Sequence, residues 1–181
     1  MSVYNSVAEI YEDIDDTRAR LFGAVEELTD EQSGFRPSPE KWTVAEIVEH
    51  LSITERRLAR MLGMLVGQLE AGAAREEGSA FAPVSVAEYV ERAGREKYTA
   101  PEEIRPTGAP LPDSLARLRD SRATILDLRP RVERVDGTRA QFPHPAWGPL
   151  DLYQWLAFVG LHEQRHLSQI EALRETMNVE P

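Results

Sequence analysis

Near its carboxyl end the chain contains two histidines four residues apart, within the sequence GLHEQRHL at residues 160–167. Residues at this spacing project from the same face of a helix, about one turn apart. His162 and His166 can therefore give one metal ion two imidazole nitrogens, each about 2.0–2.1 Å from it if the metal is zinc. The same string is also an H-E-x-x-H box, in which Glu163 would activate water in a zinc peptidase. The segment predicts a metal site and leaves its kind open.

The two histidines lie in line with apolar residues of a helix that we expect from about Pro149 to about Met177. This apolar stripe comprises Leu152, Trp155, Val159, Ile170 and Leu173. Rings that point into an apolar core need a partner for each donor and acceptor nitrogen. A shared metal would give both rings such a partner.

A third histidine, His50, borders the apolar stripe of an earlier helix. That helix is expected from the capping-box sequence at Thr43–Glu46 to about Gly72. A single helical histidine is more often a core or interface residue than a ligand. His50 therefore becomes a candidate metal ligand only in combination with His162 and His166. Three imidazoles from two facing helices would leave coordination positions open, as in catalytic zinc sites.

A zincin-type peptidase is one alternative. Such enzymes need a further ligand downstream, as in H-E-x-x-H-x-x-G-x-x-H. Here the glycine and third histidine positions hold Gln169 and Ala172, and the glutamates that follow lie on the same helix or at its end. The sequence therefore favours other metal chemistry, and Glu163 is equally explained as a solvated residue beside Arg165.

Two polar residues near the expected site have open roles. His144 lies in the proline-rich turn Phe142–Pro145, where we expect a loop or lid residue, and it is the spare candidate for a ligand or proton carrier. Gln169 is placed to hydrogen-bond a ligand or a metal-bound water, although a surface role fits its position as well.

The elements that must position these residues are helices. The apolar spacing predicts a first helix from about Val7 to Leu28 and a third from about Asp113 to Leu128, where Pro130 ends or kinks the chain. Between the second and third helices, residues 72–112 contain a short helix expected from Ser85 to about Lys97 and then four prolines. Strand signals are almost absent, with a short extended piece conceivable at residues 139–142.

Four long amphipathic helices in 181 residues predict an all-α fold. We expect a four-helix bundle with a long crossover connection, formed as a single domain over residues 1–181. The chain is long enough for one sizeable core.

The composition excludes several classes of function. The net charge of −10 argues against nucleic acid and anionic membrane surfaces as partners. The absence of cysteine excludes disulfides, cysteine zinc ligands and a cysteine nucleophile. The acidic amino terminus lacks a signal-peptide pattern, and no apolar run is long enough to span a bilayer. A cytoplasmic protein is expected.

Three segments together resemble the DinB/YfiT-like superfamily of metal-binding helical bundles, and the resemblance covers essentially the whole chain. KWTVAEIVEHL at residues 41–51 is similar to the family's W-[ST]-x-x-E-I-x-x-H-[LIV] segment. HPAWGPL at residues 144–150 is similar to the H-P-x-x-G-x-[LI] turn of the YfiT-like branch. Residues 162–170 resemble the carboxyl-terminal H-x-x-x-H-[LV]-x-x-[IL] motif, although Arg165 stands where that branch often has a histidine.

The resemblance implies one divalent metal, nickel or zinc, held by His50, His162 and His166, with water completing the shell. Family members with assigned activities usually transfer or isomerise small molecules with a low-molecular-weight thiol, such as bacillithiol, mycothiol or glutathione. Others are described as metal-dependent hydrolases, and dimers are common. The resemblance thus implies a small-molecule substrate and a homodimer.

Three hypotheses follow for the function. The first is a metal-dependent thiol S-transferase or hydrolase that uses the three-histidine site. The second is the zincin-like peptidase, which requires Glu163. The third is a non-enzymatic bundle in which the histidines store or sense a metal or are purely structural. Without a cysteine of its own, the first would need an external thiol, which a divalent metal binds as the thiolate.

Overall fold

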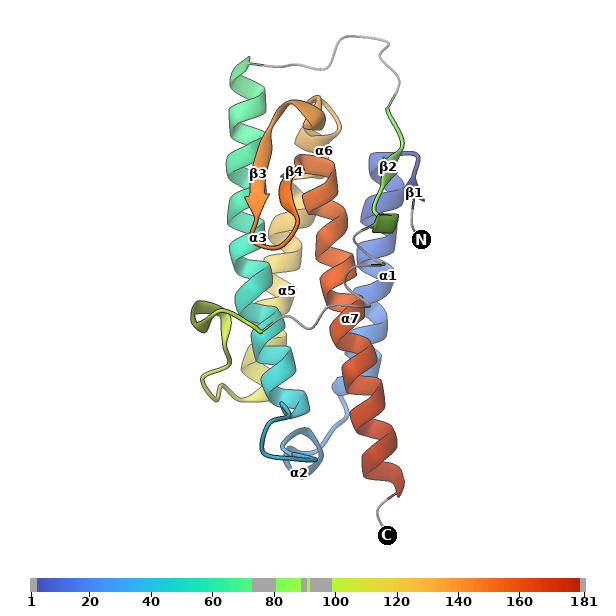
Figure 1. Ribbon diagram of the computed structural model, residues 1–181, viewed down its shortest axis with the longest axis vertical. Coiled ribbons are helices and arrows are strands. Elements are labelled where there is room, and N and C mark those ends of the chain that lie inside the picture. Colours follow the sequence, from blue (N-terminus) through green and yellow to red (C-terminus); the bar gives the residue numbers. More distant parts are fainter. Residues whose placement is uncertain (1–2, 73–80, 89–90, 92–98, 180–181) are drawn as a thin grey trace.

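Four long helices form a bundle in the computed structural model, which describes residues 3–72, 81–88, 91 and 99–179 (Figure 1). The long helices are α1 (Val7–Val25), α3 (Val44–Gly72), α5 (Leu111–Asp127) and α7 (Leu152–Val179). Helix α3 packs against α5 and α7, and α1 packs against α7. The expected all-α four-helix bundle is therefore confirmed, and no helix among these residues is long and apolar enough to cross a membrane.

The described residues also form short elements, most of them between the long helices. They are α2 (Asp30–Ser33), α6 (Arg129–Val132), two short 3-10 helices, η1 (Glu102–Ile104) and η2 (Gly137–Arg139), and four short strands. Strands β1 (Val3–Tyr4) and β2 (Val84–Ser85) pair antiparallel, as do β3 (Gln141–His144) and β4 (Gly148–Asp151). Most of the short helix expected from Ser85 to about Lys97 lies outside the described residues.

Several boundaries differ from the sequence expectations. The last helix begins at Leu152 rather than near Pro149, because Asp151 and Gln154 form a capping box and Pro149 belongs to β4. A hairpin precedes α7, with its turn at residues 145–147, and β4 begins at Gly148, whose φ of 77° favours glycine. The third long helix begins at Leu111, and Pro130 lies in the first turn of α6, which produces the expected break.

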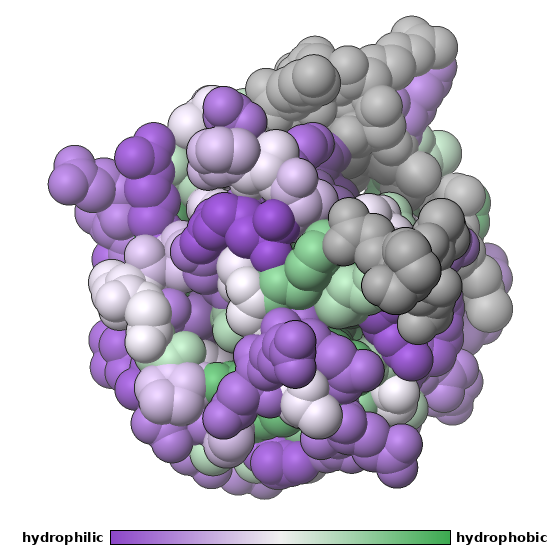
Figure 2. Space-filling model, turned by 90° about the horizontal axis from the view of Figure 1, so that it is seen from below, coloured by the Kyte–Doolittle hydropathy of each residue, from purple (hydrophilic) through white to green (hydrophobic). Residues whose placement is uncertain are grey.

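The bundle core consists of two apolar clusters, one toward each end of the long helices. The first includes the buried apolar residues between Leu58 and Leu69 of α3 and between Leu152 and Val159 of α7. The second includes the buried apolar residues between Val44 and Leu51 of α3 and between Leu167 and Leu173 of α7. The space-filling view from below shows mainly hydrophilic residues around apolar ones at that end of the bundle (Figure 2), as expected for amphipathic helices with inward apolar faces.

A group of polar side chains occupies the interior where these two clusters meet. We call it the polar layer, and it comprises Arg18 of α1, His50 and Glu55 of α3, Arg122 of α5, and His162, Glu163 and His166 of α7. All are buried except His162, which is half-buried. Buried polar groups of this kind are stable only when they are paired or hydrogen-bonded, so the contacts within the layer identify the candidate site.

Candidate metal centre

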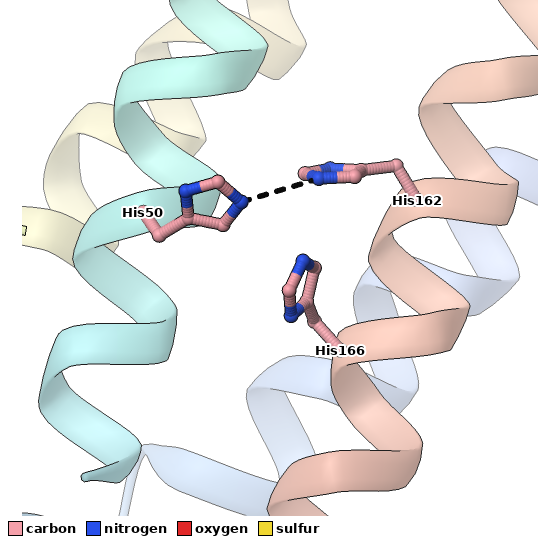
Figure 3. Close-up of side chains that lie close together, drawn as sticks. All are labelled: His50, His162 and His166. Atoms are coloured by element: carbon pink, nitrogen blue, oxygen red, sulfur yellow. Dashed lines mark hydrogen bonds between the residues drawn. The ribbon is translucent and has the colours of Figure 1, made fainter. Parts of the chain in front are cut away.

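The three histidines expected as ligands lie together between α3 and α7. His50 comes from α3, and His162 and His166 come from successive turns of α7 (Figure 3). One ring nitrogen from each lies within 4.8 Å of those from the other two. The Nε2 atoms of His50 and His162 are 3.3 Å apart. The structure thus brings together all three predicted ligand residues, although two come from a helix more than a hundred residues further along the chain.

The donor set fits a divalent transition metal. Two nitrogens bound at about 2.05 Å with a tetrahedral angle lie roughly 3.3 Å apart, which matches the Nε2–Nε2 distance between His50 and His162. Three imidazoles are typical ligands for zinc and nickel. Three protein ligands also leave at least one coordination position for an exogenous group.

Hydrogen bonds at Nδ1 of two of the rings determine which ring nitrogen is available to a metal ion. His50 Nδ1 lies 2.7 Å from the backbone carbonyl oxygen of Ile104, and His166 Nδ1 lies 2.9 Å from Oε1 of Gln169. These oxygens only accept, so each Nδ1 carries the proton and each Nε2 presents a lone pair. Metal-bound histidines commonly have such a partner. Gln169, whose role was open, therefore orients His166.

Burial keeps the three rings neutral, as metal ligands must be. Burial lowers the pKa of His50, although the hydrogen bond to Ile104 opposes the shift. Burial and the proximity of the other two histidines hold the pKa of His162 well below its usual range. Burial, followed by the nearby His50, lowers the pKa of His166 to about 4. All three rings are thus unprotonated at neutral pH in the folded protein.

The metal-free protein is expected to become less stable on acidification. The pKa of His166 is about 4 in the folded state and about 6.5 when unfolded, so the unfolded chain binds more protons between these values. This contribution to stability is complete above pH 6.5 and is lost as the pH falls toward 4. From about pH 7.5 to about pH 5 the loss from His166 alone is about 2 kcal/mol.

Urea unfolding of metal-free protein at the two pH values measures this effect. A His166→Leu variant is the matched control, since it lacks the titrating ring, and its pH dependence should be smaller by about 2 kcal/mol. Equal pH dependence in the two proteins would contradict the assignment to His166.

Aromatic rings surround the triad. Trp42 lies 5.0 Å from His50 between ring centroids, and Phe158 lies 5.5 Å from His162. His144, the spare candidate ligand, stacks on Trp147 at 4.4 Å and contacts Phe158 at 5.0 Å. It therefore lies beyond Phe158 and is not part of the three-histidine cluster.

Glu163, the potential catalytic base of the H-E-x-x-H box, points away from the histidines into a buried ionic cluster. Its Oε1 accepts a hydrogen bond from Arg18 Nε at 2.5 Å, and its Oε2 accepts one from Arg122 Nη2 at 2.8 Å. Glu55 completes the cluster through the same two arginines, at 2.5 and 3.1 Å. The alternative of a solvated Glu163 is wrong, because the residue is buried. Its two oxygens bind arginines rather than the region of the histidines, which argues against the peptidase alternative.

This ionic cluster was not predicted from the sequence. Each long helix contributes one member, namely Arg18, Glu55, Arg122 and Glu163. A signal was present, since each charge interrupts an apolar row at helical spacing, as Arg18 does between Ile14 and Leu21. Two positive and two negative charges balance within the cluster, so it functions as a structural element of the bundle.

Comparisons with known proteins agree with this architecture. The protein YuaE of Bacillus subtilis (strain 168), which is uncharacterized, is 29% identical over 167 residues, covering 88% of this chain and 94% of YuaE. The solved structure of TT2238, a four-helix bundle protein, matches with a TM-score of 0.60 at 22% identity, covering 92% of this chain and 98% of that one.

A second solved structure, YfiT from Bacillus subtilis, has a TM-score of 0.59 at 21% identity and covers 96% of this chain and 88% of its own. YfiT is described as a probable metal-dependent hydrolase with an unusual four-helix bundle topology. The family model of the DinB superfamily matches residues 13–170. This match includes all three clustered histidines, and it confirms the resemblance found in the sequence motifs. The chain therefore belongs to the DinB superfamily.

Proposed function

We propose that this protein is a metal-dependent enzyme that acts on a small molecule, with His50, His162 and His166 as the ligands of one zinc or nickel ion. The observation that carries the proposal is the convergence of three neutral imidazoles within 4.8 Å, two of them with Nδ1 held by an acceptor. The hydrogen bonds at Nδ1 leave the Nε2 lone pairs of His50 and His166 available to a metal, and His162 Nε2 lies 3.3 Å from that of His50.

A divalent cation at this point supplies Lewis acidity, which favours the deprotonated form of a thiol or water at neutral pH. The chain's own residues supply the surroundings. Trp42 packs against His50 and Phe158 packs against His162, which shields those sides from water.

The first candidate reaction is transfer of a low-molecular-weight thiol to an electrophilic substrate. It is supported by the open coordination that three protein ligands leave and by the lack of any cysteine in the chain, so the nucleophile must come from outside. The second candidate is hydrolysis, which the likeness to YfiT supports.

Cobalt-substituted protein distinguishes these reactions. Adding glutathione, bacillithiol or mycothiol should produce a sulfur-to-cobalt charge-transfer band, and the same thiol should be consumed with an electrophile such as chlorodinitrobenzene. Ester or amide cleavage without any thiol band would favour the hydrolase. Loaded protein that shows neither would contradict an enzymatic role and leave a metal-binding bundle.

A further inference from the structure

The crossover connection returns to α3 beside the metal centre. Its residues 104–109, which we call the strap, begin at the last residue of η1 and lie against the amino-terminal half of α3 (Figure 1). At one end of the strap, the Ile104 carbonyl accepts the hydrogen bond from His50 Nδ1 at 2.7 Å. The strap therefore touches a candidate metal ligand directly.

The other end of the strap is held by Glu49, the residue before His50. The Thr107 hydroxyl donates to Oε1 of Glu49 at 2.7 Å. The backbone N–H groups of Gly108 and Ala109 donate to Oε2 at 2.8 and 3.0 Å. Gly108 has a φ of 96°, a conformation that favours glycine and brings these successive N–H groups onto one oxygen.

Glu49 is unusual for a residue this deeply buried. Only 1% of the Glu49 surface is exposed. Its hydrogen-bond donors among the described residues are a hydroxyl and two backbone amides, not an arginine or a lysine. Burying a carboxylate is costly unless it is well hydrogen-bonded. Three donors from one short segment meet this requirement, so the carboxylate and the strap depend on each other.

We propose that Glu49 is a positioning residue of the metal centre, which clamps Thr107, Gly108 and Ala109 and thereby keeps the Ile104 carbonyl on Nδ1 of His50. Two consecutive residues of α3 thus bind the two ends of one segment. The clamp fixes the ring orientation of His50 and the tautomer that presents Nε2 toward the other two histidines. This role deepens the proposed function and rests on it for its consequence in metal binding.

The substitution that tests the clamp is Glu49→Gln. The amide keeps the size of the side chain but replaces one acceptor oxygen with an NH2 group, which would face the donors of the strap. In metal-free protein with ¹⁵N-labelled histidine, we expect the wild-type His50 ring to be the Nδ1–H tautomer with a slowly exchanging proton. In the variant, that proton should exchange at least about tenfold faster, and the ring nitrogens should show a mixture of tautomers.

Two controls separate positioning from general loosening. The Nδ1 proton of His166, held by Gln169, is an internal reference and should not change. Glu46→Gln removes another carboxylate of α3, one that caps Thr43 at the start of the helix and does not touch the strap. That variant should leave the His50 ring as in wild type.

Metal affinity gives the second readout, since loss of an outer partner of a metal ligand typically costs about 10–100-fold in affinity. Zinc titration with a competing chelator should show this loss for Glu49→Gln and much less for Glu46→Gln. Unchanged His50 exchange in Glu49→Gln, or equal changes at His50 and His166, would overturn the role of Glu49. If wild-type protein binds no zinc or nickel, the proposed function fails, and the tautomer measurement alone still decides whether Glu49 positions His50.

Discussion

Replacing Glu163 with alanine is expected to destabilise the protein by about 3–5 kcal/mol. The substitution leaves Arg18 and Arg122 buried with one carboxylate, Glu55, between them. Two guanidinium groups would then share a single buried carboxylate, and the nearest other negative charge, Asp15 at 3.3 Å from Arg122, is about half exposed. For a chain of this length, the loss corresponds to a decrease of roughly 10 °C in melting temperature.

A matched exposed pair separates burial from charge. Glu171 also lies on α7 and pairs with Arg20 at 3.6 Å, but both side chains are about half exposed. Alanine there should cost at most about 1 kcal/mol, because solvent screens the pair. Chemical denaturation of the two variants measures the difference. Comparable small losses would show that the four-charge cluster contributes little to folding.

The peptidase alternative, based on the H-E-x-x-H motif, makes a different prediction for Glu163. If Glu163 were a catalytic base, its replacement by glutamine would abolish turnover in protein that remains folded. In the structure Glu163 holds α7 to α1 and α5 through the two arginines, so the expected effect is on stability. Glu163 directly follows His162, so its side chain projects about 100° around the helix from that of His162.

The helices and the ligand pair could be predicted from local sequence because both depend on periodicity. Apolar residues at helical spacing located all four long helices, and the four-residue spacing of His162 and His166 placed them on one face. The position of His50 beside the pair was predicted on weaker grounds, since it required α3 to face α7. That packing depends on the whole bundle, and the family resemblance supported it.

The parts that could not be predicted depend on contacts between distant segments. The strap contacts at Glu49 and His50 join residues more than fifty positions apart, and nothing in the proline-rich sequence indicates which carbonyl it presents. The extended piece suggested at residues 139–142 overlaps β3, but its pairing with β4 was not predicted. Pro143 and Pro149 suppress ordinary strand signals, although these two residues pair in the structure. The ionic cluster needed charges on four helices to be matched with one another.

Replacing His50 with alanine is expected to weaken zinc or nickel binding by at least about 1000-fold, equivalent to about 4 kcal/mol. His50 is the ligand candidate that α3 contributes, so its loss leaves two imidazoles from one helix and no ligand on the opposite side of the site. The effect should exceed the roughly 10–100-fold that loss of an outer hydrogen-bond partner costs. Isothermal titration with a competing chelator measures it on protein purified without a histidine tag.

His144→Ala is the matched control, since it removes the remaining histidine, whose ring lies beyond Phe158 and outside the cluster. It should retain wild-type metal content by mass spectrometry, whereas His50→Ala should purify almost metal-free with its helical circular dichroism intact. Full metal content in His50→Ala would contradict three-histidine coordination. Because the three rings come from both α3 and α7, bound metal should also raise the unfolding free energy of the wild type. The increase should follow RT ln(1 + M/Kd), where M is the free metal concentration, and His50→Ala should lose it.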